Sequence, residues 1–489
     1  MLLEIMKREI SISEIVYLLY FSIMFGARAI GLYEGMMLYN VSLIVGMLLF
    51  ALKIATTEHT LFEYLVMFVL LSISLLVYHN TGEKGLLLYM TMVLGMKGVS
   101  LKRVEKIALT VLGICFPLLV FLSVVGIIKD IAYKADSRLL PGEMLRRSLG
   151  YPYFNTMFTT YIVLVVLIML VRGYRNRKSL ILWSLFLFLV GAYLYVYSCS
   201  NTGMIVLTIF LLANLMFQNK SDIGKYQAVL ANVLYPLGMA ISIILPVVIK
   251  GNSFSMLDKI LHNRLNYANY YLTHEPVTLF GVRFQQAPND NYIIDSSYLY
   301  SFLQLGIVPC IILTAFMIIM INRLIRENKR IELAVVVSFC ILGLSDPFFF
   351  NLSYKNIMML FVGEYFYMYI EKISNRLPKV FNNSFSIIES GKIEFVNNAA
   401  YIAWKRMGNA IGGVFDCYGT RKFTIMIIVA LLMFFISFKF MDADAITGIV
   451  DTISEWEYFR KSMSVGLWSG IGVVALICLF GHNDDKSTS

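Results

Sequence analysis

The sequence predicts an all-α integral membrane protein, a polytopic helical bundle with about fourteen transmembrane helices. Of its 489 residues, 58% are hydrophobic and only 15% are charged, against about 25% charged in soluble domains. The mean hydropathy is +0.73. Many separate apolar runs approach the roughly 20 residues that a helix needs to cross about 30 Å of hydrocarbon. Because backbone groups in lipid must be satisfied internally, these runs favour helices over a barrel.

The apolar runs give the predicted order of the helices. They lie at about 12–30, 36–55, 60–79, 85–99, 106–128, 153–171, 180–198, 203–217, 227–249, 296–322, 331–349, 355–371, 423–440 and 464–480. With a cytosolic N-terminus, alternation places about 26 of the 41 Lys and Arg inside and about 15 outside. This asymmetry follows the positive-inside rule and predicts that both termini are cytosolic.

The chain divides into three parts. Residues 1–371 form a membrane core of about twelve helices, residues 372–422 a cytosolic connector, and residues 423–489 an appended helix pair and tail. The loop inside that pair carries a D-x-D, Asp442 and Asp444, a pattern that binds metal and nucleotide sugar in many soluble glycosyltransferases. It lies on the predicted outer side, where nucleotide sugars are scarce. We interpret it as a chance acidic loop and expect the appendage to be dispensable for chemistry.

Several classes of function lack sequence support. The chain has no H-E-x-x-H, Walker loop or G-x-G-x-x-G, so ATP-driven or Rossmann-type chemistry has no support. We expect no bound metal and no cofactor. The net charge of +10 reflects basic cytosolic loops, because no soluble basic domain exists to hold a nucleic acid. The six cysteines form no disulfide framework and no C-x-x-C.

The predicted outer loop at about 250–295 contains an amphipathic segment, residues 257–272. As one helix it would lie on the membrane surface with Arg264 in the middle of its apolar arc. That guanidinium could reach a lipid headgroup, pair with a carboxylate or bind a phosphate. Asp258 and Glu275 are poorly placed on the wheel, which favours a substrate phosphate.

The other long outer loop, at about 129–152, predicts a short helix from Pro141 to Gly150. Arg146 and Arg147 lie on its polar side. They form either a solvated face or a second cation site for an anionic substrate.

Acidic and histidine side chains in the outer segments are candidate general bases for a sugar hydroxyl. They are His262, His274, Glu275, Asp290 and Asp295. Asp295 also precedes a membrane helix, so it is equally a candidate N-cap. Asp346, before Pro347, is either a helix-end group or a carboxylate that faces the site.

Four segments resemble the O-antigen polymerase and ligase superfamily, in that family's usual order across about residues 140–371. The first, RRSLGYPYFN, matches at Arg147, Leu149, Gly150, Tyr151, Pro152 and Asn155. The second is the outer turn SCSNTG, residues 198–203, where Asn201 stands in place of an arginine that many relatives carry.

The third segment, LFGVRFQQAPNDNYIIDSSYLYSFLQLGIV, matches at Gly281, Asp295, Ser297, Tyr298, Gly306 and Ile307. Arg283 replaces the second glycine of the family's F-G-x-G and adds a phosphate contact to the expectation. The fourth, GLSDPFFFNLSYKN, carries Asp346 in place of the more usual Glu, and Asn356 follows it.

The resemblance implies a Wzy-type polymerase in the bacterial cytoplasmic membrane, which builds capsule or exopolysaccharide from undecaprenyl-diphosphate-linked repeat units at the outer face. The implied partners are the lipid-linked substrate, membrane lipids, and a flippase and chain-length regulator of the same pathway. The expected catalytic residues are His274, Glu275 and Asp295. The expected diphosphate ligands are Arg264, Arg147, Arg146 and Arg283, and the expected substrate contacts are Tyr298, Asn155 and Asp346.

Two alternatives remain open. A ligase of the same superfamily would transfer finished glycan in a single step. A lipid-linked oligosaccharide flippase would also suit fourteen helices, but it should carry cations along a membrane-embedded path and not in two outer loops.

The topology predicts that a cysteine at Asn266 is labelled from outside intact cells by a membrane-impermeant thiol reagent, whereas one at Ser374 is not. Residues 250–295 are outside and residues 372–422 inside, because basic clusters recur in every other connection. The native-cysteine protein supplies the background. Labelling at position 374 but not at 266 would show that the true topology is the reverse of the predicted one.

Overall fold

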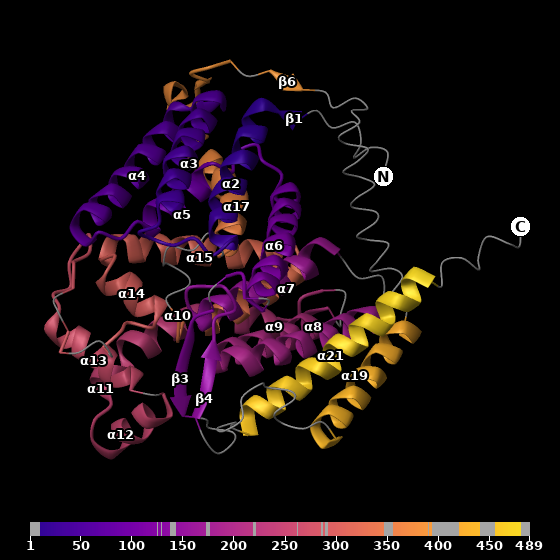
Figure 1. Cartoon of the computed structure of the whole chain (residues 1–489). Coiled ribbons are helices and arrows are strands. Elements are labelled where there is room, and N and C mark those ends of the chain that lie inside the picture. The colour runs from indigo at the N-terminus through magenta and orange to yellow at the C-terminus, as the bar shows by residue number, and fades with distance from the viewer. Residues whose placement is uncertain are drawn as a thin grey trace, which may run out of the picture.

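The computed structural model describes residues 10–124, 126–128, 130–136, 143–172, 177–218, 222–261, 263–284, 287–288, 292–346, 356–389, 391–393, 420–440 and 455–480. This part of the chain is overwhelmingly helical (Figure 1). Its strands are short and form two-stranded pairs: β1 (Ile10–Ser11) with β6 (Lys392–Ile393), β2 (His59–Thr60) with β5 (Ser384–Phe385), and β3 (Ala132–Asp136) with β4 (Glu143–Arg147).

The helices follow the predicted apolar runs closely. In order they are α2 (Ile12–Ala29), α3 (Met37–Thr56), α4 (Leu61–Thr81), α5 (Gly85–Leu94), α6 (Leu101–Val124), α7 (Phe154–Arg172), α8 (Arg177–Ser198), α9 (Asn201–Phe217), α10 (Lys225–Ile243), α11 (Leu245–Val248), α12 (Gly251–Ile260), α13 (Arg264–His274), α14 (Ser297–Leu303), α15 (Ile307–Arg326), α16 (Arg330–Leu342), α17 (Met358–Ser374), α19 (Thr420–Phe440) and α21 (Glu455–Phe480), with a 3-10 helix η2 at Lys379–Asn382.

Within the described residues, eight helices are long and apolar enough to cross a membrane, judged by length and composition. The helices α5 and α9 and parts of α19 and α21 are shorter apolar segments. This confirms a helical chain built for a membrane; the number of fourteen spans stays a prediction. One continuous apolar core draws side chains from α2 through α17.

The run predicted at 296–322 is not one helix, because α14 ends before Gly306 and α15 begins after it. Gly306 has φ +97°, a region that residues with a Cβ rarely adopt. The amides of Ile307 and Val308 donate to the carbonyls of Thr278 and Leu279 at 3.0 and 3.1 Å. The loop after α13 therefore satisfies the backbone groups that the break exposes.

Gly281 makes that close approach sterically feasible. Its φ is +80°, and a Cβ built there would lie 2.1 Å from the carbonyl oxygen of Gln304. A Cβ on Gly306 would lie 2.3 Å from the amide nitrogen of Gly281. The two family-like glycines therefore pack against each other where the loop crosses the helix break.

The helix predicted from Pro141 to Gly150 is wrong. Residues 143–147 form strand β4, which pairs antiparallel with β3 so that Arg146 faces Tyr133 and Arg147 faces Ala132. A helix of about ten residues is marginal without tertiary support, whereas β3 supplies backbone partners to β4. Leu149 and Gly150, with φ +48° and +87°, end the hairpin. Pro141 lies outside the described residues.

The single amphipathic helix predicted over 257–272 is also wrong, because the segment divides into α12 and α13. Asn263, at φ +66°, separates them; Asn tolerates this left-handed conformation better than most residues. Arg264 is therefore the first residue of α13. The helical wheel that placed Asp258 away from Arg264 does not apply, because the two residues lie on different helices.

The C-terminal helices α19 and α21 pack along each other, and α21 also lies against α8 (Figure 1). The Tyr193 hydroxyl lies 3.0 Å from Ser464 Oγ, and Trp468 Nε1 donates to that hydroxyl at 3.3 Å. The helix pair thus contacts the core through specific polar groups.

In Figure 1 the β1–β6 pair lies toward one end of the bundle, and the β3–β4 hairpin, α12 and α13 lie toward the other. The two predicted outer loops therefore share one end of the bundle. Near the opposite end Ser374 is buried and donates to Asn382 Oδ1. Val380, which is 64% exposed, is thus the better labelling position for the predicted inner side.

We expect Gly281→Ala to destabilise the protein far more than Gly82→Ala. Both glycines have φ near +80°, but a Cβ on Gly82 meets no atom within 4 Å. Left-handed strain alone costs about 1–2 kcal/mol, and overpacking at Gly281 adds about 1–3 kcal/mol. Thermal unfolding of the purified variants in detergent measures the difference. Equal losses in the two variants would show that the loop does not press on the α14–α15 break.

Candidate functional site

The most prominent charged contact at the predicted outer end joins α13 to the segment before α14. Arg264 Nε donates to Asp295 Oδ2 at 3.0 Å, and the two side chains are 33% and 35% exposed. Asp295, and neither Asp258 nor Glu275, is therefore the carboxylate partner of Arg264. It is not an N-cap: Ser296 caps α14, and its Oγ accepts from the amide of Leu299.

The pair leaves polar atoms free for a ligand. Among the described residues, neither Nη atom of Arg264 nor Oδ1 of Asp295 has a protein partner. Burial raises the pKa of Asp295 above its ordinary value, although the neighbouring Arg264 charge acts in the opposite direction. The pair therefore offers two guanidinium donors beside a carboxylate that is a stronger base than an exposed aspartate.

His274 and Glu275 lie at the far end of α13 from this pair. The helix has 11 residues, which separates its ends by roughly 15 Å at about 1.5 Å per residue. His274 is exposed, stacks on the Tyr270 ring at 4.3 Å, and its Nδ1 lies 2.9 Å from the Tyr270 carbonyl oxygen. Glu275 is buried. The structure does not bring either residue to the Arg264–Asp295 pair.

The two hairpin arginines have different surroundings. Arg147 Nε lies 3.9 Å from Asp130 Oδ2, and Asp130 Oδ1 also accepts from the amide of Leu149 at 2.9 Å. The Arg146 guanidinium lies 5.1 Å from the centre of the Phe154 ring. Successive residues of a strand point to opposite faces, which explains why the neighbours do not share a partner. No described ion pair or hydrogen bond links Arg147 to Asp295, the partner of Arg264.

The first two family-like segments meet in space. Ser200 Oγ donates to Asn155 Oδ1 at 2.9 Å, which joins the turn between α8 and α9 to the start of α7. Cys199 has φ +48°, and the Tyr195 hydroxyl donates to Asn201 Oδ1 at 2.6 Å. Asn155 is exposed at this junction.

The last two family-like segments also meet. Ser297 Oγ donates to the carbonyl of Asp346 at 2.5 Å, and the Ser297 amide donates to Gly343 O at 2.8 Å. The Tyr298 hydroxyl donates to the carbonyl of Cys340 at 2.7 Å, and its ring is 0% exposed. The prediction that Tyr298 contacts substrate is therefore wrong for this structure, because its ring is enclosed and its hydroxyl is used between helices.

The other predicted site residues lie apart from the Arg264–Asp295 pair or outside the residues that the structure describes. Arg283 is exposed in the loop that follows α13. Asp346 lies just after α16, where its carbonyl holds Ser297. His262, Asp290, Asp442 and Asp444 lie outside the described residues.

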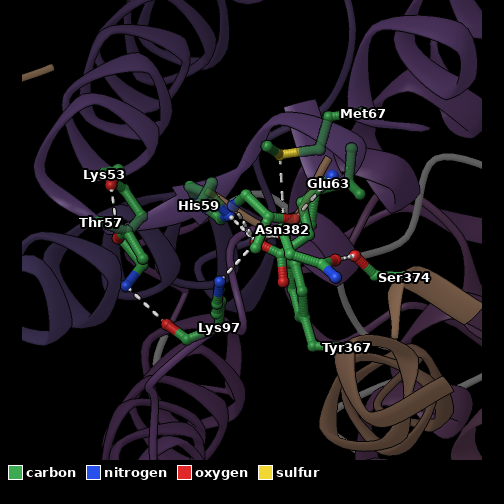
Figure 2. Close-up of polar contacts among 11 residues, drawn as sticks. Lys53, Thr57, His59, Glu63, Met67, Lys97, Tyr367, Ser374 and Asn382 are labelled. Carbon is green, nitrogen blue, oxygen red and sulfur yellow. Dashed lines mark hydrogen bonds and ion pairs between the residues drawn. The ribbon is translucent and has the colours of Figure 1, made fainter. Parts of the chain in front are cut away.

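A buried polar cluster near the β2–β5 pair was not predicted from the sequence. Figure 2 shows Lys53, His59, Glu63 and Lys97 gathered there with Tyr367. Lys97 Nζ pairs with Glu63 Oε2, which also lies 3.2 Å from His59 Nδ1. Lys53, 0% exposed, donates to the carbonyl of Lys97 at 2.8 Å.

A sequence signal for part of this cluster exists. Thr60 and Glu63 form a capping box at the start of α4: the Glu63 amide donates to Thr60 Oγ1 at 3.2 Å, and the Thr60 amide donates to Glu63 Oε2 at 2.9 Å. The T-x-x-E pattern before an apolar run marks such a helix start. The partners from α3, from the turn after α5 and from α17 lie outside the T-x-x-E pattern, so the pattern does not reveal them.

Comparison with protein-family models, with curated proteins and with solved structures found no match to this chain.

We expect protonation of His59 to destabilise the protein as pH falls. Burial lowers the pKa of His59, although its contact with Glu63 acts in the opposite direction. The unfolded chain, with an ordinary pKa of about 6.5, binds the proton more readily, so stability decreases as pH drops through about 6.5 toward the lower folded pKa. The midpoint of thermal unfolding in detergent at pH 7.5 and 5.5 measures this loss.

The matched variants for this test are His59→Gln and His79→Gln, the second at an exposed histidine on α4. The His59 variant should lose part of the pH dependence and the His79 variant should keep it. Glu63, Lys97 and Lys53 lie beside position 59 and are retained in both variants, so the difference between the two pH profiles reports the loss of His59 together with its contact to Glu63. Identical pH dependence in the wild type and His59→Gln would show that His59 does not contribute.

Proposed function

We propose that the chain is a polymerase that joins polyprenyl-diphosphate-linked oligosaccharide units by glycosyl transfer at the outer face of a bacterial cytoplasmic membrane. It crosses the membrane about fourteen times with both termini in the cytosol. The observation that carries the proposal is the Arg264–Asp295 contact of 3.0 Å. It combines an anion ligand and a general base in one half-buried pair, and Asp295 lies in the third segment that resembles the polymerase and ligase superfamily.

The chemistry follows from the free atoms of the pair. The acceptor hydroxyl oxygen attacks the anomeric carbon of the donor, and the bond from that carbon to the diphosphate oxygen breaks. Asp295 Oδ1 takes the hydroxyl proton, while the Arg264 Nη groups bind the diphosphate as its negative charge grows. Charge stabilisation by preorganised donors is commonly the largest catalytic term, about 2.7–4 kcal/mol for one donor. No nucleotide or metal is required for this step.

Arg147 of the hairpin acts as a further anion ligand in this proposal, whereas Arg146, on the opposite face of β4, has a lesser role. Arg147 is the more important of the two, since it occupies the family-like position and Asp130 orients it. Arg146 stacks on Phe154, so its loss removes packing as well as charge. Asn155, at its contact with Ser200, and Asp346, at its contact with Ser297, contact the sugar units in this proposal.

We expect Arg264→Lys to reduce turnover about ten- to a thousandfold at matched protein levels. Lysine keeps the positive charge but lacks the planar guanidinium group. In arginine the two Nη groups can bind the diphosphate while Nε donates to Asp295. The assay incubates purified protein in detergent with a synthetic lipid-diphosphate repeat unit and resolves the products by length. Arg326→Lys, at an exposed arginine at the end of α15 on the predicted inner side, is the control and should polymerise normally.

The products also separate the alternatives. A ladder identifies a polymerase, one transfer identifies a ligase, and lipid scrambling in vesicles without product identifies a flippase. Wild-type turnover by Arg264→Lys would refute the diphosphate role of Arg264 and leave its pairing with Asp295 as a structural contact.

A further inference from the structure

The C-terminal helix α21 places a buried arginine against the hairpin. Arg460 is 0% exposed. Its Nη1 donates to the carbonyl of Leu145, in β4, at 3.2 Å, and its guanidinium lies 4.8 Å from the centre of the Tyr197 ring. One side chain from the end of the chain therefore touches two elements of the core.

Both contacted elements lead to residues of the proposed site. Leu145 directly precedes Arg146 and Arg147 in β4. Tyr197 lies at the end of α8, three residues before Ser200, whose hydroxyl donates to Asn155. Arg460 thus connects the strand that carries two predicted diphosphate ligands with the turn that holds a predicted sugar contact.

Simple packing does not explain this arginine. Burying a guanidinium is costly, and well-packed apolar residues commonly replace buried charges without loss of stability. The hairpin, in contrast, needs external support, because an isolated two-stranded pair is marginally stable at best. The bond to Leu145 O restrains the peptide group that joins Leu145 to Arg146.

We propose that Arg460 is a positioning residue for the donor diphosphate, an inference that rests on the proposed function. It fixes β4 so that Arg147 is held ready for the anion, and the cation–π contact with Tyr197 links this strand to the end of α8. The appended helix pair is therefore part of the active unit. This replaces the expectation that it is dispensable for chemistry.

The test compares the full-length wild type with Arg460→Met, Arg460→Lys and Ser464→Ala. Ser464→Ala removes a different polar contact of the same interface, the one with Tyr193, and controls for weaker docking of α21. Three readouts are taken: kcat and KM for the synthetic lipid-diphosphate donor, hydrogen exchange of residues 143–147 by mass spectrometry, and the thermal midpoint in detergent.

Arg460→Met should raise KM for the donor about tenfold or more, change kcat less, and accelerate hairpin exchange without a comparable fall in thermal midpoint. Arg460→Lys should restore part of the affinity, and Ser464→Ala should behave as the wild type. A donor KM and hairpin exchange in Arg460→Met within twofold of the wild type would overturn the inference while the polymerase function stands.

A loss of kcat that merely parallels the loss of thermal stability, without a change in KM, would also overturn the positioning role. Wild-type protein that forms no product from the donor refutes the polymerase function itself. In that case the positioning role falls with it, even when hairpin exchange still depends on Arg460.

Discussion

Backbone hydrogen bonding in a medium without water is the constraint on which this structure depends. A helix satisfies its own amides, so the apolar runs become helices wherever nothing else intervenes. The break between α14 and α15 is permitted because another segment supplies the missing acceptors: the carbonyls of Thr278 and Leu279 bind the amides of Ile307 and Val308. The same loop continues to Asp295, so the geometry of the break helps to place the ion pair.

Much of the fold could be predicted because membrane helices are recognisable in a sequence from the length and hydropathy of their apolar runs. The run at 60–79 became Leu61–Thr81, and the run at 153–171 became Phe154–Arg172. The failures occurred where tertiary contacts decide. Residues 143–147 became a strand because residues 132–136 lie alongside them, and Gly306 divided a run whose hydropathy is continuous. Local periodicity contains no information about either partner.

The candidate site was predicted less completely for the same reason. The sequence identified Arg264 and Asp295 separately, 31 residues apart, but a helical wheel compares only residues of one helix. It also suggested Tyr298 of α14 as a substrate contact. The ring of Tyr298 is fully buried, and its hydroxyl donates to the carbonyl of Cys340 in α16. The two glycines matched in the third segment did indicate a spatial contact, since Gly281 and Gly306 pack directly against each other. The close packing of the loop after α13 against the break between α14 and α15 therefore explains why both positions are glycine.

The pairing of β2 with β5 sets an order of events during synthesis. His59 pairs with Phe385, a residue made about 325 positions later, which at about 5–20 residues per second corresponds to roughly 15–65 s. During that interval the first helices are already in the bilayer, while the strand that closes over His59 does not yet exist. Glu63 and Lys97 become available to each other much earlier, because they lie only 34 residues apart. Their ion pair therefore needs no residue from the later part of the chain, whereas the β2–β5 pairing does.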